Sequence, residues 1–155
     1  MVTDIAAPPE RCFDLVRSVD LHLRSAAHTG ERVVGGVSGG LLGPGDVVTF
    51  RAWHLGLPMA LTTRITAYER PRRLRGTQLR GAFRRFEHDH HFAPLGAGTR
   101  LTEIVAFEAP GGALGRLVAR AVLAGHLRRF LAARNRVVKA VAESDEWAAY
   151  LPGPR

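Results

Sequence analysis

The stretch FRRFEHDHHF, residues 83–92, concentrates three histidines and two acidic residues in a segment that otherwise alternates like a β-strand. Side chains two positions apart in a strand share a face. One set is therefore Arg84, Phe86, His88, His90 and Phe92. The other set is polar throughout and is expected to face water: Arg85, Glu87, Asp89 and His91. We expect the phenylalanines to point inward, with His88 and His90 between them.

The following segment, RLTEIVAFEAP, is predicted to form the partner strand, joined through the hairpin loop LGAGT. Its inner set is Leu101, Glu103, Val105 and Phe107. Placing Phe92 opposite Leu101 puts His90 opposite Glu103. The same register puts His88 opposite Val105 and Phe86 opposite Phe107. Apolar residues then meet apolar residues and a histidine meets an acid, which supports this register.

An inward histidine beside an inward glutamate needs a reason, because burying an unpaired ionisable group is costly. One interpretation is a structural His90–Glu103 hydrogen bond inside a wet cavity, with no chemistry. The other is a polar anchor that orients the hydroxyl, carbonyl or carboxylate of a ligand in an otherwise apolar pocket. The two are compatible. His54, which shares a strand face with Phe50 and Ala52, is a further candidate for this group.

The same residues would also suit two other kinds of site. Zinc could be bound by His88, His90 and either Glu103 or His54. However, H-x-H alone is a weak signal, and we expect neither a metal nor a cofactor.

A cyclase- or dehydratase-type enzyme would transfer protons through His90 and Glu103 and polarise a carbonyl with Arg84. Arg84 at the pocket mouth as a solvated charge is the commoner state. Binding without catalysis is favoured, and enzymatic activity is left open.

The elements that must position these residues follow from periodicity. Short helices are expected over 8–17 and 19–25, a bent strand from residue 31, and strands over 46–55 and 58–69. LRGTQLRG adds a short strand before the histidine-rich one. After Pro110 the spacing becomes helical, which predicts a long helix over about 112–143. A curved antiparallel sheet cannot bury its concave face alone, so this helix must close it as an α+β fold.

A ligand cavity of roughly 300 to 1,000 Å³ is expected between sheet and helix. Its predicted apolar walls are Ile65, Phe86, Val105, Phe107, Leu117 and Ala121, and its predicted polar contacts are His54, Arg84, His88, His90 and Glu103. The 155 residues fit one domain, expected over 1–146, with a loose tail over 147–155.

The net charge of +8 makes a module for nucleic acid or anionic membranes a third hypothesis. However, Lys139 is the only lysine among 22 basic residues, and the arginines are scattered. This looks like compositional bias and disfavours nucleic acid as a partner.

No window is apolar enough to cross a bilayer, and the N-terminus lacks the features of a signal peptide. Cys12 alone forms no intrachain disulfide, which suits the cytoplasm. No pattern specifies an oligomeric state.

Three segments carry a resemblance to a known superfamily: IAAPPERCFDLV, ITAYERPRRL and FEHDHHFAPLGAGTRLTEIVAFEAP. Together they resemble the helix-grip superfamily of START lipid-transfer domains, birch-pollen-allergen-like proteins and polyketide cyclase/dehydrase-like proteins, grouped as SRPBCC. The resemblance covers almost the whole chain. It implies about seven strands wrapped around the C-terminal helix, with a largely apolar cavity between them. It does not imply one activity. The expected function is to bind or carry a lipid, an isoprenoid or an aromatic polyketide.

Overall fold

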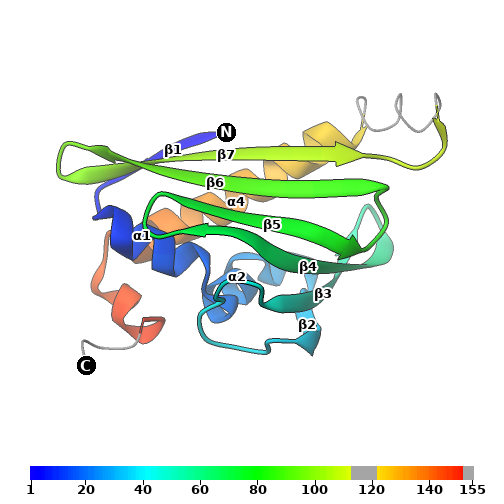
Figure 1. The fold of residues 1–155 in the computed structure, drawn as a ribbon, viewed down its shortest axis with the longest axis horizontal. Helices are drawn as coiled ribbons and strands as arrows, with labels where there is room; N and C mark the ends of the chain where they lie inside the picture. Colours follow the sequence, from blue (N-terminus) through cyan, green and yellow to red (C-terminus); the bar gives the residue numbers. More distant parts are fainter. Residues whose placement is uncertain (113–121, 152–155) are drawn as a thin grey trace.

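The computed structural model describes residues 1–112 and 122–151 and contains one antiparallel sheet with helices on one side of it (Figure 1). The elements run in the order β1 (Val2–Ile5), α1 (Pro9–Val16), α2 (Val19–Ser25), η1 (Ala27–Thr29), β2 (Arg32–Gly36), β3 (Val47–His54), β4 (Leu57–Glu69), β5 (Arg73–Arg80), β6 (Arg85–Leu95), β7 (Gly98–Glu108), α4 (Ala124–Ala142) and η3 (Asp145–Ala149). This confirms the α+β helix-grip arrangement with two short N-terminal helices.

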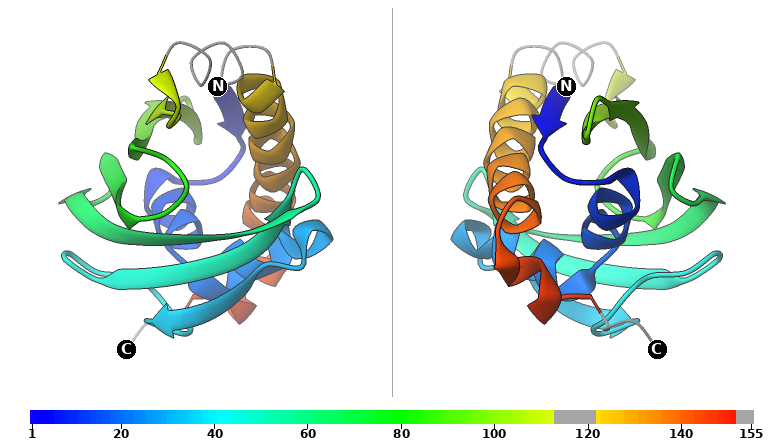
Figure 2. Two further views of the ribbon diagram at one scale, coloured as in Figure 1. Left: turned by 90° about the vertical axis from the view of Figure 1, so that its right-hand side faces the viewer. Right: turned by 90° about the vertical axis from the view of Figure 1, so that its left-hand side faces the viewer.

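The seven strands lie in the order β1-β7-β6-β5-β4-β3-β2. Strands β2 to β7 form a continuous meander, and β1 adds to the free edge of β7, with Val2 opposite Thr102 and Ile5 opposite Thr99. The sheet curves, and α1, α2 and α4 lie on its concave side (Figure 2). The residue pattern did not predict β1, because four residues are too few to show an alternation.

The two N-terminal helices begin where their capping residues allow. Pro8 is extended and Pro9 occupies the first turn of α1, where the missing amide hydrogen costs nothing. Ser18 caps α2, since its side-chain oxygen accepts a hydrogen bond from the amide of Leu21 at 3.3 Å. Both helices therefore match the predicted ranges 8–17 and 19–25.

The hydrophobic core lies at one end of the molecule, where α1 packs against the sheet and α4. The ring of Phe13 is fully buried and meets Tyr68 and Phe92 edge to face, at centroid distances of 5.2 and 5.4 Å. Val138 and Val141, in the C-terminal half of α4, belong to the same cluster. The N-terminal half of α4 is thus left to cover the other end of the sheet.

The C-terminal region differs in part from expectation. Helix α4 ends at Ala142, close to the predicted 143. Residues 113–121, which include Leu117 and Ala121, lie outside the described structure.

The tail expected to be loose, residues 147–155, is packed as far as residue 151, the last one that the structure describes. Trp147, Tyr150 and Leu151 contact the core, and the Arg11 guanidinium lies 4.5 Å from the centre of the Trp147 ring. None of the helices in the described residues is long and apolar enough to span a bilayer.

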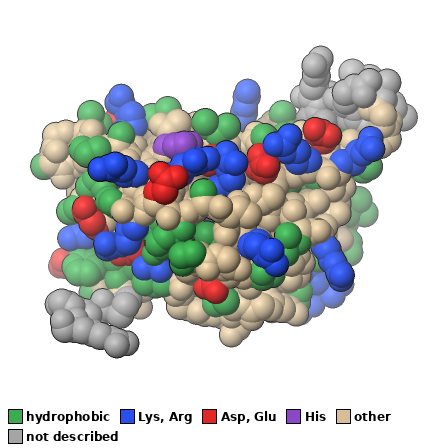
Figure 3. Space-filling view, in the orientation of Figure 1, with side chains coloured by type: hydrophobic (Ala, Val, Ile, Leu, Met, Phe, Trp, Pro, Cys, Tyr) green, Lys and Arg blue, Asp and Glu red, His purple; other side chains and the backbone are tan. Residues whose placement is uncertain are grey.

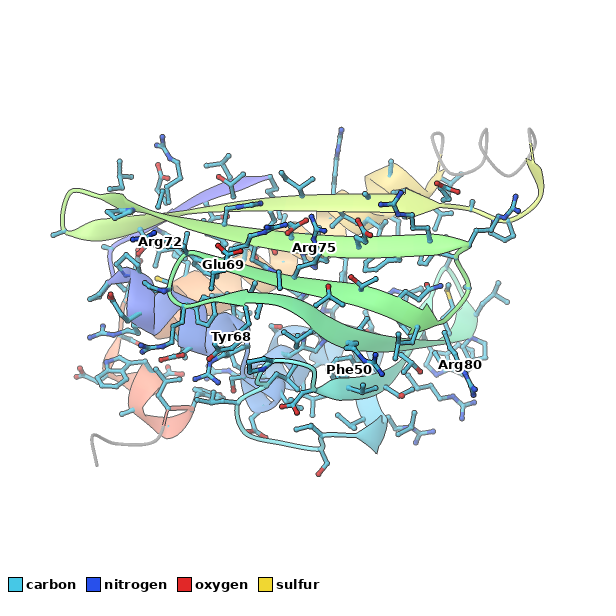
Figure 4. All side chains as sticks on the ribbon, in the orientation of Figure 1. Phe50, Tyr68, Glu69, Arg72, Arg75 and Arg80 are labelled. Atoms are coloured by element: carbon cyan, nitrogen blue, oxygen red, sulfur yellow. The ribbon has the colours of Figure 1, made fainter. Side chains whose placement is uncertain are left out.

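The convex face of the sheet carries a band of arginines interspersed with acids (Figure 3). Asp89, expected to face water, is instead 7% exposed, because Arg73 and Arg75 close over it from β5. Their Nε atoms donate to its two oxygens at 3.1 and 2.7 Å, and Arg75 is labelled in Figure 4. Pairing of this kind leaves fewer of the arginines free for phosphate groups.

Candidate functional site

A cavity lies between the sheet and the N-terminal half of α4. The cavity volume is about 180 Å³, which is below the expected range of roughly 300 to 1,000 Å³. Helix α4 fills part of the space with Phe130, Leu131 and Arg134, which the sequence analysis did not place there. The described lining is mostly apolar and is interrupted by a few polar side chains. It includes Phe50 (labelled in Figure 4), Ile65, Leu74, Phe86, Val105 and Phe130.

The β6–β7 hairpin places the predicted histidines and glutamate as expected. His90 pairs with Glu103, His88 with Val105, Phe86 with Phe107 and Phe92 with Leu101. A two-residue turn at Gly96 and Ala97 fixes this register, and Gly96 has the positive φ of 58° that such turns favour. His88, His90 and Glu103 are all buried on the inner face.

The hydrogen bonds of Glu103 differ from the predicted pair. His88 Nε2 donates to Oε1 at 3.1 Å, and the Asn135 amide donates to Oε2 from α4. His90 Nε2 lies 3.3 Å from the same Oε1, but its angle does not make a hydrogen bond. Both ring nitrogens of His90 lack a partner among the described residues. The predicted proximity is thus confirmed, whereas the hydrogen bond belongs to His88.

Burial and neighbouring charges set the protonation of this group. Burial raises the pKa of Glu103, but the hydrogen bond from His88 and the charges around it outweigh burial and bring the pKa to about 2. Burial lowers the pKa of His90 well below its ordinary value of 6.5, and His88 adds to that effect. At neutral pH the site therefore holds an ionised carboxylate beside a neutral imidazole.

A second polar group lies on the α2 side of the cavity. His22 Nε2 contacts Glu31 Oε1 at 3.0 Å, and Arg134 Nη2 donates to His22 Nδ1 at 3.0 Å. These two contacts suit a neutral His22 that donates to Glu31 and accepts from Arg134. The other oxygen of Glu31 has no partner among the described residues.

His54 pairs with a histidine of α4 rather than with His88 and His90. Its Nδ1 lies 3.1 Å from Nε2 of His126, on α4. The neighbouring Trp53 points outward and is exposed, which confirms the face assigned to β3.

Arg134 is the functional candidate that the sequence analysis missed. Its side chain lines the cavity and is 8% exposed. The helical spacing of the sequence does indicate this position. One apolar stripe of the helix consists of Leu127, Leu131, Val138 and Val141, and Arg134 falls within it. An arginine within an apolar stripe is a buried polar group that needs an explanation.

The predicted site residues divide into four groups. His54, Ile65, Phe86, His88, His90 and Val105 line the cavity. Glu103 and Phe107 are not in the described lining, since Glu103 lies behind the histidines and Phe107 packs on Phe83. Arg84 is exposed and outside it, because β6 begins only at Arg85. The residues on the expected helical stripe, Leu117 and Ala121, lie outside the described range.

Comparisons with known proteins agree with this architecture. The family profile described as "Polyketide cyclase / dehydrase and lipid transport" matches residues 1–143. None of the curated proteins matches the sequence.

Three solved structures illustrate the shared fold. TTHA0849 from Thermus thermophilus is 22% identical, with a TM-score of 0.71 over 92% of this chain and 97% of that one. A START superfamily protein from Mycobacterium smegmatis is 16% identical, with a TM-score of 0.67 over 92% and 94%. Major latex-like protein 151 from Panax ginseng is 16% identical, with a TM-score of 0.65 over 93% and 95%.

Proposed function

This chain belongs to the polyketide cyclase / dehydrase and lipid transport family, and from that premise we propose that it binds an apolar small molecule in the cavity between the sheet and α4. The ligand class is a lipid, an isoprenoid or an aromatic polyketide that carries at least one polar oxygen. The mostly apolar lining supports the apolar part of this proposal, and the buried polar groups support the oxygen.

The observation that carries the proposal is the state of His90. Its side chain lines the cavity, is 7% exposed and has two ring nitrogens without a partner among the described residues. A buried polar group left unsatisfied costs about 1 to 3 kcal/mol. A hydroxyl or carbonyl on a ligand would remove that cost and would fix the orientation of the ligand. Arg134 offers a second, cationic position for a ligand oxygen.

Gly76 provides a sharp test, because it lines the cavity and a Cβ added to it meets nothing within 4 Å. Gly76 pairs with His88, so a larger side chain there would occupy the space in front of the histidines. We expect Gly76→Leu to abolish binding of an anilinonaphthalene sulfonate dye, and of lipids retained from a host extract in native mass spectrometry, while the chain stays folded. The matched control is Ala106→Leu, which adds the same side chain on the exposed face of β7. Equal binding by both variants would contradict an internal site.

An enzymatic function is the second candidate, because an imidazole without a partner among the described residues lies 3.3 Å from a carboxylate at the cavity wall. Arg134 would replace the exposed Arg84 as the cation that polarises a carbonyl. His90→Gln separates the two functions: retained binding with lost turnover of an aromatic polyketide would favour the enzyme, whereas the absence of turnover by the parent chain would favour binding alone.

A further inference from the structure

We propose that His88, His90 and Glu103 bind a divalent transition-metal ion of the zinc type, with the remaining coordination positions open to the cavity. This inference does not rest on the proposed lipid-like ligand. It concerns ion binding by the side chains themselves, and it departs from the expectation, based on the H-x-H pattern alone, that no metal would bind.

The ligand geometry is the first argument. One donor atom from each residue lies within 4.8 Å of the others. His88 Nε2 and His90 Nε2 lie 3.1 and 3.3 Å from the same Glu103 Oε1. With metal–ligand bonds of about 2.0 to 2.1 Å, two donors in a tetrahedral site are about 3.3 Å apart. Both histidine–glutamate distances therefore match this spacing, and the third distance, between the two histidines, is no more than 4.8 Å.

The fold holds these donors firmly. His88 and His90 are two apart on β6, and Glu103 is opposite His90 on β7, so the pairing of two central strands fixes all three. Two imidazoles and one carboxylate are a donor set that suits zinc or ferrous iron and disfavours magnesium and calcium, which take oxygen ligands.

The unpartnered nitrogens of His90 are the second, independent argument. Its side chain is more than nine-tenths buried, and neither nitrogen has a hydrogen bond within the described part of the chain. A metal ion would bond one of these nitrogens and would replace the His88–Glu103 hydrogen bond with two coordinate bonds. The observed arrangement leaves both nitrogens of His90 without a partner among the described residues, whereas a metal ion would satisfy one of them.

The surroundings also orient the carboxylate. Asn135 donates to Glu103 Oε2 and to Thr3 Oγ1, which directs the other oxygen, Oε1, toward the two histidines. Outer hydrogen bonds of this kind orient metal ligands. Arg134, which lines the same cavity, opposes a bare cation but favours an anionic oxygen as a further ligand. A divalent ion with Glu103 alone has one uncompensated positive charge, so a hydroxide or an anionic ligand oxygen would complete the site.

The test uses the whole chain, without a histidine tag, freed of metal with a chelator and titrated with zinc chloride in a calorimeter. We expect one equivalent to bind, and Co²⁺ to give the intense visible bands of a four-coordinate site. Glu103→Gln and His90→Gln should each lose at least about tenfold in zinc affinity, and Asn135→Ala about 10- to 100-fold. His91→Gln is the matched control, because His91 is on the same strand and faces outward. His54→Gln controls for the His54–His126 pair.

No zinc binding by the parent chain would overturn the proposal, as would binding that survives in Glu103→Gln or that disappears only in His54→Gln. Circular dichroism of each variant identifies those that fail to fold. If the Glu103 variant is among them, the parent titration and the His90→Gln variant still decide the outcome.

Discussion

Asp89 and His90 are neighbours on β6 and are equally buried, at 7% exposure each, yet their surroundings are opposite. Asp89 points to the convex face, where Arg73 and Arg75 bond both of its oxygens. His90 points into the cavity and has no hydrogen-bond partner among the described residues. The Asp89 carboxylate is satisfied by the neighbouring strand, whereas the His90 imidazole has both nitrogens unpaired in the part of the chain that the structure describes. Asp89 is thus a buried polar group that the fold satisfies, and His90 is one that the fold leaves without a partner among the described residues.

The largest stability effect is expected on the convex face. Asp89→Leu removes the acceptor shared by two arginines and leaves Arg73 with only its 3.6 Å contact to Glu69, which should lower the free energy of unfolding by about 2 kcal/mol. Urea denaturation at pH 7 measures this, and Asp89→Asn, which keeps the shape, is the matched variant. Dye binding in the cavity should not change. A variant as stable as the parent would show that the convex-face pairs contribute little.

A smaller stability effect is expected at the next residue, His90. Its replacement should impair binding in the cavity, which replacement of Asp89 should leave unchanged. His90→Leu replaces an unsatisfied buried polar group by an apolar one of similar size, so the stability should stay within about 1 kcal/mol of the parent or rise. Dye and zinc binding should both be impaired. A loss of stability as large as that of Asp89→Leu, measured in the same urea series, would mean that His90 has a structural role and would remove the contrast between the two faces.

The smallest stability effect is expected at Asp14, a carboxylate that, like Asp89, accepts hydrogen bonds from two arginines. Burial raises the pKa of Asp14, but hydrogen bonds from Arg70 and Arg17 outweigh it and bring the pKa below the ordinary 3.8. The unfolded chain therefore takes up a proton first as the pH falls. The stabilisation by Asp14 is complete above about pH 5 and is lost as the pH drops through the folded-state pKa.

Asp14→Asn should accordingly be less stable than the parent at pH 7, and the difference should shrink below about pH 4. Thermal denaturation of both chains at pH 7 and pH 3 measures this. A difference that does not depend on pH would contradict the role of the Asp14 charge.

Much of the fold could be predicted from local patterns. The period-2 alternation of β6 and β7, with a short loop between them, determined which side chains point inward and which residues are paired. The helices α1 and α2 were predictable because capping residues and the spacing of apolar residues act over a few positions. Strand β1 was not predicted, since it exists only because β7 offers it a free edge.

The candidate site was predicted in its location but not in its contacts. His88, rather than His90, bonds Glu103, because a side chain can reach the diagonal neighbour across a strand pair as well as the residue opposite. Arg134 rather than Arg84 enters the cavity, because the rotation of α4 over the sheet depends on packing between elements far apart in the sequence.

The sequence by itself therefore determined the architecture, the inner face of β6 and the pairing of His90 with Glu103, since backbone periodicity and loop length act locally. Only the tertiary structure decided which groups are satisfied. Arg73 and Arg75 reach Asp89 from the neighbouring strand, and Asn135 reaches Glu103 from α4. A hydrogen bond depends on the distance and direction between side chains that the fold brings together, and a pattern along the chain records neither.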